Sequence, residues 1–289
     1  MSAKLRLDLL LTQRGLFESR ARATAAVLAG EVLLLPGRER ALKPGQMVRP
    51  EIEVEVAREL PYVSRGGIKL ANALDHFGFN VQERLALDVG ASTGGFTDCL
   101  LQRGAEHVIA LDVAYGELSW KLREDQRVTV IERCNARAVE RDALPYAPDL
   151  IVMDLAFISL TKVLAAVLAL AAPEYDCLAM VKPQFEVGRE RIGKGGVVRS
   201  AIHRREALIA VAECAQGLGA AVYGYASSGL PGPKGNRESF LWLGQPGRPG
   251  ALTTAGALSE AVLAVEPELD TGPESGGEVD SGDGSEPLR

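Results

Sequence analysis

The sequence predicts an α/β fold in which an open sheet carries the functional residues, and three stretches support this class. Residues 87–96 run from apolar, β-forming residues through a glycine-rich turn into an apolar segment that suits a helix. Residues 108–112 form a second apolar run that ends in an acid. The stretch 149–154 is apolar between its two terminal acids, as expected of a parallel strand covered on both faces.

The glycine-rich turn indicates a ligand-binding cradle. Backbone that approaches a ligand closely, or adopts a positive φ, requires glycine because a Cβ would collide. The spacing differs from the Gly-x-Gly-x-x-Gly pattern of dinucleotide-binding folds. Its form, acid-x-Gly-x-x-x-Gly-Gly, is associated with enzymes that use S-adenosylmethionine (SAM). The turn therefore predicts SAM as the cofactor, with ligands drawn from Asp88, Gly90, Ser92, Thr93, Gly94, Gly95 and Phe96.

Two further cofactor ligands are expected at later strand ends. Asp112 lies about 20 residues beyond the turn, where the carboxylate of α/β nucleotide folds accepts hydrogen bonds from ribose hydroxyls. Asn135 follows the expected strand 128–131, where a contact to the adenine side would fall. The alternative is a glycine turn in an arbitrary α/β protein with Asp112 at a solvated strand end. The correct spacing of Asp112 favours the SAM interpretation.

The charge of the chain is unevenly distributed. The formal net charge is −6, but residues 251–289 contain nine acids and one base, so the remainder carries +2. The overall acidity therefore does not exclude a nucleic-acid partner. From Pro267 onward the chain is rich in Gly, Ser, Pro and acids, and this composition predicts disorder.

Composition also restricts location and metal chemistry. The four cysteines are scattered without ligand-like spacing, which indicates reduced thiols in a cytoplasmic protein and predicts no metal site. The longest apolar run, 163–172, is too short to span a bilayer, so no stable membrane insertion is expected. Nothing in the sequence predicts an obligate protein partner.

The chain is expected to contain two domains, a linker and a tail. Residues 1–59 are expected to form a small α+β domain with two short helices in 4–28, and residues 60–63 are expected to form a linker. Residues 64–246 are expected to form the large α/β domain, and residues 247–289 are expected to form an acidic, disordered tail. The expected elements of the large domain include a helix from Ser64 to about Phe77, helices 159–172 and 201–218, and strands 177–181, 220–226 and 238–243.

The N-terminal domain is similar to a known RNA-binding module. The motifs Arg6-Leu7-Asp8, Arg14-Gly15-Leu16, Ser19-Arg20, Gly30-Glu31-Val32 and Lys43-Pro44-Gly45 resemble the alpha-L RNA-binding domain of a ribosomal protein and of pseudouridine synthases. Residues 1–45 contain eight bases against four acids, and arginines on one helical face can pair with phosphates. The alternative is a solvated basic face on a small interaction domain. The candidate RNA-binding residues are Arg6, Arg14, Arg20, Arg22, Lys43, Arg65 and, in a basic loop further on, Arg189.

Four charged residues in the large domain resemble a catalytic set. Lys69, Asp154, Lys182 and Glu238 match the Lys-Asp-Lys-Glu tetrad of FtsJ-like RNA 2′-O-methyltransferases in order and in context. With the basic N-terminal module, the resemblance extends to the TlyA family and covers residues 4 to about 243. It implies a Rossmann-like SAM-dependent methyltransferase sheet of seven strands, the last antiparallel. It further implies 2′-O-methylation of cytidine in ribosomal RNA of the small or large subunit, or both.

The chemistry explains why such a reaction would use these residues. A ribose 2′-hydroxyl is a poor nucleophile at neutral pH, so the enzyme must align it with the methyl group and ease removal of its proton. A lysine that is partly shielded from water beside another cation can bind or accept that proton. We therefore expect Lys182 to contact the 2′-oxygen, with Lys69 tuning the site electrostatically. Asp154 and Glu238 would position the two amines, and Asp154 would also lie close to the SAM methyl.

Three alternatives remain open at this point. A SAM enzyme acting on a small molecule or protein would not need residues 1–59. A membrane-active protein is suggested because TlyA-like proteins are also described as haemolysins, but no transmembrane run or strongly amphipathic basic helix supports it. A non-catalytic RNA-binding protein is disfavoured by the intact tetrad. The sequence does not specify which cytidine is modified, the oligomeric state or the role of the tail.

Overall fold

The structure is a computed structural model that describes residues 4–28, 31–37, 39–41, 43–56, 61–232 and 234–267. The contacts divide the chain into two compact units, Met1–Arg65 and Gly66–Arg289. We call them the N-terminal unit and the C-terminal unit and describe each by itself. The division falls just after the expected linker 60–63, of which Leu60 lies outside the described residues.

The N-terminal unit combines two short helices with short antiparallel strands. Apolar residues of α1 and α2 pack with those of the strands into a small core of its own, formed by Leu7, Leu10, Leu11, Ala23, Ala26, Val27, Val32, Ala41 and Val48. The two helices expected in residues 4–28 are present. The elements are β1 (Leu5–Arg6) paired with β4 (Met47–Val48), α1 (Leu7–Gln13), α2 (Arg20–Leu28), and β2 (Val32–Leu34) between β3 (Glu39–Arg40) and β5 (Val54–Val56).

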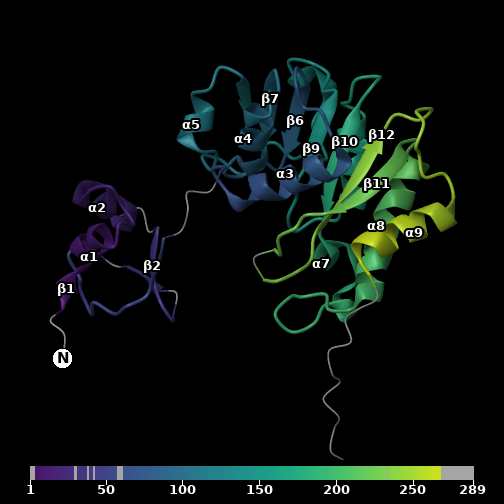
Figure 1. The fold of residues 1–289 in the computed structure, drawn as a ribbon. Coiled ribbons are helices and arrows are strands. Elements are labelled where there is room, and N and C mark those ends of the chain that lie inside the picture. Colours follow the sequence, from purple (N-terminus) through teal and green to yellow (C-terminus); the bar gives the residue numbers. More distant parts are fainter. Residues whose placement is uncertain are drawn as a thin grey trace, which may run out of the picture. The chain divides into compact units, whose positions relative to one another are not determined.

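The C-terminal unit is built on one seven-stranded sheet, which confirms the predicted fold class. In space the strands follow the order β11-β12-β10-β9-β6-β7-β8 (Figure 1). The last strand along the chain is antiparallel to both of its neighbours, as predicted. The strands are β6 (Leu85–Val89), β7 (His107–Leu111), β8 (Val128–Ile131), β9 (Leu150–Met153), β10 (Asp176–Val181), β11 (Ala221–Ser227) and β12 (Ser239–Gly244).

Helices cover both faces of this sheet because successive strand residues point to opposite sides. One face packs against α6 (Leu164–Leu168), α8 (Ala201–Gly217) and α9 (Ala255–Val265) in a common apolar core. On the other face, the rings of Phe96 in α4 (Gly95–Gln102) and Phe240 in β12 lie 5.7 Å apart. Likewise Phe77, at the end of α3 (Arg65–Phe77), packs 5.1 Å from Trp242 of β12.

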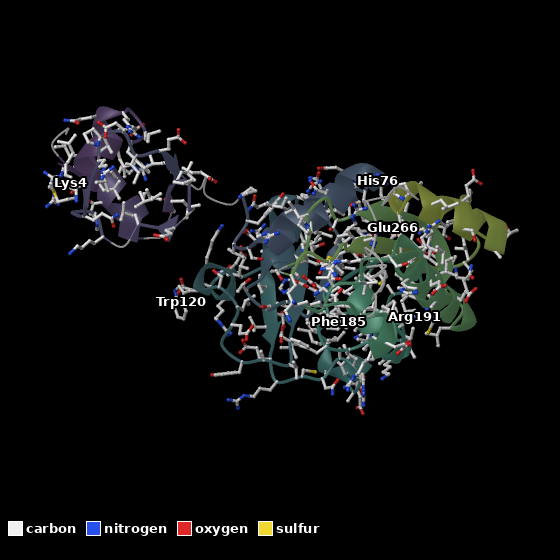
Figure 2. The ribbon with its side chains drawn as sticks, turned by 90° about the horizontal axis from the view of Figure 1, so that it is seen from below. Lys4, His76, Trp120, Phe185, Arg191 and Glu266 are labelled. Carbon is white, nitrogen blue, oxygen red and sulfur yellow. The ribbon has the colours of Figure 1, made fainter. Side chains whose placement is uncertain are left out.

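Shorter elements complete the unit. They are α5 (Trp120–Arg123), α7 (Pro183–Glu186) and the 3-10 turns η1 (Arg141–Ala143), η2 (Leu160–Lys162) and η3 (Arg189–Arg191). The expected helix 159–172 is thus realised as η2 followed by α6. Trp120 on α5 and Glu266 after α9 lie on opposite sides of the C-terminal unit (Figure 2), in agreement with the strand order, since α5 packs on β8 and α9 on β11.

The expectation of a disordered tail from residue 247 is wrong for residues 247–267. Helix α9 is capped at its N-terminus by Thr254, whose hydroxyl accepts a hydrogen bond from the Ala257 backbone N–H at 3.1 Å. Leu258 and Val262, one turn apart, are buried in the core against the sheet. The acid-rich composition of the whole stretch obscured this short apolar stripe. Residues 268–289 lie outside the described residues.

Candidate active site

The glycine-rich turn after β6 is shaped by two close approaches. At Gly90, with φ of +88°, a Cβ would lie 2.6 Å from the backbone oxygen of Asp154. At Gly94, with φ of +93°, a Cβ would lie 2.2 Å from Leu122 Cδ1 on α5. Both positions combine a backbone conformation that favours glycine with space that admits no side chain. Gly90 brings the turn against the end of β9, whereas Gly94 lets α5 pack on it.

A pocket of about 460 Å³ opens at the carboxyl ends of the strands, beside Gly90. This volume is in the range of small-molecule sites, roughly 300–1,000 Å³. Of the expected cofactor ligands, Gly90, Ser92, Asp112, Asn135 and Asp154 line it. The remaining lining combines apolar with polar side chains: Leu111, Val113, Ala114, Glu117, Cys134, Ala136, Leu155, Ala156, Phe157, Ile158 and Val163. Polar groups at the strand ends and an apolar wall suit a nucleoside with a charged side arm, so the residues fit SAM.

Asp112 is held in one orientation at the end of β7. Its Oδ2 accepts a hydrogen bond from the Ser92 backbone N–H at 2.7 Å, and its Oδ1 accepts one from Ala114 N–H at 2.8 Å. Each carboxylate oxygen retains capacity for another donor, such as a ribose hydroxyl. The Ser92 hydroxyl donates to Glu117 Oε2 at 3.1 Å. Sequence reasoning missed Glu117, because no spacing rule marks it.

The other residues expected to bind the cofactor do not line the pocket. Asp88 is fully buried, and its Oδ2 accepts hydrogen bonds from Thr97, at 2.9 Å from the backbone N–H and 2.7 Å from the hydroxyl. Burial raises the pKa of Asp88 to about 7, the Thr97 hydrogen bond opposes this rise, and the nearby Asp154 charge adds to it. Phe96 packs on Phe240. Together with Thr93, Gly94 and Gly95, these residues shape the turn instead of lining the pocket.

The four tetrad residues form two ion pairs of different exposure. Lys182 Nζ lies 2.5 Å from Asp154 Oδ1, and these side chains are 14% and 25% exposed. Lys69 pairs with Glu238, and these side chains are only 9% and 1% exposed. Asp154 also lines the pocket, so the Lys182–Asp154 pair borders it directly. The second pair lies in the protein interior.

Sheet register explains how residues so distant in sequence reach one edge. Val181 of β10 pairs with Ser239 of β12, which sets Lys182 opposite Glu238 at the next position. Asp154 follows Met153 of β9, the parallel neighbour of β10. By alternation, the three side chains belong to the face that α3 covers, and α3 supplies Lys69.

The FtsJ-like methyltransferase family model matches residues 62–245, well over half of the chain and the whole of this sheet. The chain belongs to the FtsJ-like methyltransferase family. It is therefore a methyltransferase that uses SAM, as the sequence predicts. This family model begins at residue 62, so it covers only the last four residues of the N-terminal unit, 62–65.

Two curated relatives and one solved structure are similar over most of this FtsJ-like methyltransferase. The 16S/23S rRNA (cytidine-2′-O)-methyltransferase TlyA of Mycobacterium tuberculosis is 47% identical over 247 residues, 84% of this chain and 91% of the relative. The putative rRNA methyltransferase YqxC of Bacillus subtilis is 42% identical, over 85% and 88%. A structure described as a putative hemolysin from Streptococcus thermophilus has a TM-score of 0.69 and 38% identity, covering 93% and 98%.

Three of the expected RNA-binding arginines of the N-terminal unit have partners within the protein. Arg6 and Arg20 both pair with the buried Asp8, at 2.8 and 3.1 Å. The Arg6 hydrogen bond is the main reason that the pKa of Asp8 falls to about 2. Arg14 donates to the backbone oxygens of Ile52 and Pro50, at 2.7 and 2.5 Å. The other expected RNA-binding residues, Arg22, Lys43, Arg65 and Arg189, are exposed.

Two residues that sequence reasoning missed connect the ends of β9 and β10. Phe157 is 92% exposed, has a φ of +65° and lines the pocket, and its ring lies 5.5 Å from that of Phe185 on α7. Glu186 accepts hydrogen bonds from the Ser159 hydroxyl at 2.6 Å and from Leu160 N–H at 2.9 Å. Burial raises the pKa of Glu186. These contacts join the loop that carries Asp154 to the helix that follows Lys182.

The described part of the FtsJ-like methyltransferase contains no helix that is both long and apolar enough to cross a membrane. Within the same residues, no three acidic, histidine or cysteine side chains are grouped as a metal site would require. All four cysteines are free thiols, with Cys99 and Cys177 buried.

Proposed function

We propose that this enzyme transfers the methyl group of SAM to the 2′-hydroxyl of a cytidine in ribosomal RNA. The observation that carries the proposal is the Lys182–Asp154 ion pair at the edge of the pocket, backed by the buried Lys69–Glu238 pair on the adjoining strand. The names of two relatives, an rRNA (cytidine-2′-O)-methyltransferase and a putative rRNA methyltransferase, support the choice of substrate. Such an enzyme acts where ribosomes are, in the cytoplasm.

SAM supplies a methyl group activated by a positively charged sulfur. On this proposal, Asp112 holds the ribose of the cofactor, Asn135 lies on its adenine side, and the turn at Gly90 and Ser92 borders the remainder. Asp154 lies nearest the transferable methyl group. The remaining expected ligands, Asp88 and residues 93–96, act indirectly by fixing the turn.

The protein residues act on the acceptor hydroxyl. Lys182 contacts the 2′-oxygen and orients it toward the methyl group. As the new O–C bond forms, the hydroxyl proton passes to the Lys182 amine, which gives its own proton to Asp154. Asp154 holds the Lys182 amine in place across 2.5 Å. Lys69 stabilises the partial negative charge that develops on the oxygen, and Glu238 fixes Lys69. Since both amines are paired with carboxylates, the site balances its own charge before RNA arrives.

The N-terminal unit supplies affinity for RNA. Arg22 and Lys43 present exposed charge that can pair with phosphates, and the outer edges of Arg6 and Arg20 remain about half exposed despite their bonds to Asp8. Contacts of this type give salt-dependent binding with little sequence information. The cytidine would then be selected by how the ribosomal subunit docks.

The decisive experiment is tritium transfer from methyl-labelled SAM to isolated 30S and 50S subunits that lack the modification. Lys182→Ala should reduce labelling by at least about a hundredfold, in line with the usual contribution of a proton-transfer group, while SAM affinity stays within about twofold. Lys121→Ala is the matched control: like Lys182, Lys121 pairs with an aspartate, Asp98 at 3.6 Å, but it is 71% exposed on α5 and does not line the pocket. A Lys182→Ala enzyme that labels RNA at the wild-type rate would overturn the assignment.

Two other functions predict different results. An enzyme acting on a small molecule or protein would leave both subunits unlabelled although SAM binds. A membrane-active protein, as the hemolysin names of some relatives suggest, would release dye from liposomes. No contact or surface among the described residues favours either of them.

A further inference from the structure

Two loops beside the active site are fastened together. The first, residues 192–199, follows η3 and contains a small bridge between Gly193 and Val197. The second joins β11 to β12 and ends at Glu238, which pairs with Lys69. Figure 1 shows both loops at the same end of the C-terminal unit, beside α7. We call the described residues 192–199 and 234–237 the paired loops.

Asn236 makes the connection between the paired loops. Only 2% of this residue is exposed. Its side-chain oxygen accepts a hydrogen bond from Val198 N–H at 2.9 Å, and its side-chain nitrogen donates to Gly196 oxygen at 2.8 Å. Its own backbone oxygen accepts from Gly232 N–H at 2.8 Å. One buried amide thus satisfies two backbone groups of the first loop, Val198 N–H and the Gly196 oxygen, in addition to the bridge within that loop.

Arg204 holds the first loop from the opposite side. This buried residue of α8 donates to the backbone oxygens of Val198 and Arg199, at 3.2 and 2.6 Å, and to Glu266 Oε2 at 2.9 Å. Glu266 lies 4.0 Å from Arg237 of the second loop. The first loop is therefore anchored by buried side chains from two directions, although its own outer residues face solvent.

The outer surface of the paired loops is cationic. Lys194, Arg199 and Lys234 are all exposed, and none of them forms an ion pair with a described residue. A Cβ on Gly196 would lie 3.7 Å from Lys234 Nζ, and one on Gly193 would lie 3.5 Å from Arg199 Nη1. The side chains of Lys234 and Arg199 thus lie over two glycines of the same short loop. Cations gathered over one short loop favour an anionic partner, which offsets the repulsion between like charges.

The paired loops are also coupled to the active site. Gly232 accepts no larger residue, because a Cβ there would lie 2.5 Å from Glu238 Oε1. Asn236 precedes Glu238 by two residues and bonds to Gly232. Any displacement of the second loop would therefore disturb Glu238 and its partner Lys69.

We propose that the paired loops form a preassembled phosphate-binding surface for the RNA backbone next to the acceptor cytidine, with Asn236 as its positioning residue. The inference rests on the proposed function and deepens it. Lys194, Arg199 and Lys234 neutralise phosphate oxygens, and Asn236 holds the two loops so that all three cations face the same stretch of backbone. No part of this surface contacts the cofactor or the 2′-hydroxyl.

The test compares Lys194→Ala/Lys234→Ala and Asn236→Ala with the wild type in methyl transfer to unmodified 30S and 50S subunits. Loss of two phosphate contacts should raise the KM for the subunit on the order of tenfold and leave kcat within about twofold. The slope of log affinity against log salt should become shallower by about 1.5. Lys121→Ala, at the opposite edge of the sheet, should change neither quantity.

A double-mutant cycle separates positioning from mere stability. If Asn236 acts by presenting the lysines, then Asn236→Ala should lower RNA affinity by itself, and removing both lysines in that background should cost less than about twofold. If Asn236 served only to stabilise the fold, the two effects would multiply and the salt slope of Asn236→Ala would equal that of the wild type. Should Asn236→Ala fail to fold, the lysine variant still decides, since both lysines are exposed.

The outcomes distinguish this inference from the function on which it rests. Absence of label in both subunits with the wild-type enzyme would overturn the proposed function. Wild-type labelling together with an unchanged KM and salt slope in Lys194→Ala/Lys234→Ala would overturn the inference alone.

Discussion

Asp88 shows how one residue can serve the site without touching its ligand. The carboxyl group is enclosed between β6 and α4, and Thr97 occupies only one of its oxygens. Its placement fixes the start of α4, and through it the turn that borders the pocket. This burial also raises the pKa of Asp88, because water does not solvate the ionised carboxylate in the protein interior.

Asp88→Asn should therefore change how stability depends on pH. The pKa of Asp88 is raised from an ordinary 3.8 to about 7, so wild-type stability falls as pH rises through this interval, whereas the amide variant has no charge to form. The free energy of unfolding of the variant, relative to the wild type, should increase by about 2.5 kcal/mol between pH 5 and pH 8, because part of the effect is already present below pH 5. Urea unfolding at both pH values measures it. Parallel pH profiles would contradict the assignment.

Residue types at strand ends were predictable, whereas the direction of each side chain was not. Asp112, Asp154 and Lys182 follow apolar runs, and the carboxyl ends of parallel strands meet at one edge. Asp88 lies near the end of β6, just before the turn that leads into α4. Its side chain points into the interior because it accepts hydrogen bonds from Thr97 of that helix. For Arg6 and Arg20 a signal existed: Asp8 lies among the buried leucines of α1, where an acid requires a partner.

At the scale of elements, α9 is a helix held by one stripe of apolar residues and one buried ion pair. Arg204 Nε and Glu266 Oε2 lie 2.9 Å apart, and both side chains are 3% exposed. The pair joins the end of α9 to α8 and, through Arg204, to the loop 192–199. Sequence reasoning could not place α9, because composition averaged over 43 residues conceals a stripe of two turns.

Glu266→Gln should destabilise the protein by about 3 kcal/mol, since it removes the carboxylate charge that pairs with the buried Arg204 guanidinium. The exposed Glu260 on the same helix provides the control, and Glu260→Gln should change the unfolding free energy by less than about 0.5 kcal/mol. Chemical denaturation of the two variants and the wild type measures the difference. Equal stability of both variants would show that the pair contributes nothing.

At the scale of the whole molecule, basic residues divide into two groups. Arg6, Arg14 and Arg20 hold the N-terminal unit together, whereas Arg22 and Lys43 are exposed and form no ion pair with a described residue. A count of charges in the sequence does not separate these groups. The contacts do, because a guanidinium that already bridges two segments loses those bonds if it turns to a phosphate.

Arg22→Ala/Lys43→Ala should weaken binding to ribosomal subunits by roughly tenfold and reduce the salt slope by about 1.5, without loss of stability. SAM affinity should not change, because the cofactor pocket is lined wholly by the C-terminal unit. Lys121→Ala/Arg127→Ala removes the same number of charges near β8 and should bind RNA as the wild type does. Filter binding across a salt series provides the measurement. A methylation rate that is the same in Arg22→Ala/Lys43→Ala as in the wild type would favour a substrate other than RNA.

The Lys69–Glu238 pair spans 169 residues of sequence. During synthesis the chain emerges from its N-terminus, so the glycine turn and all residues that line the cofactor pocket are made well before Glu238. A chain that ends before residue 238 contains every residue that lines the pocket but lacks the partner of Lys69. The enzyme thus acquires its full charge arrangement only once Glu238 has been made, after six of the seven strands of the sheet.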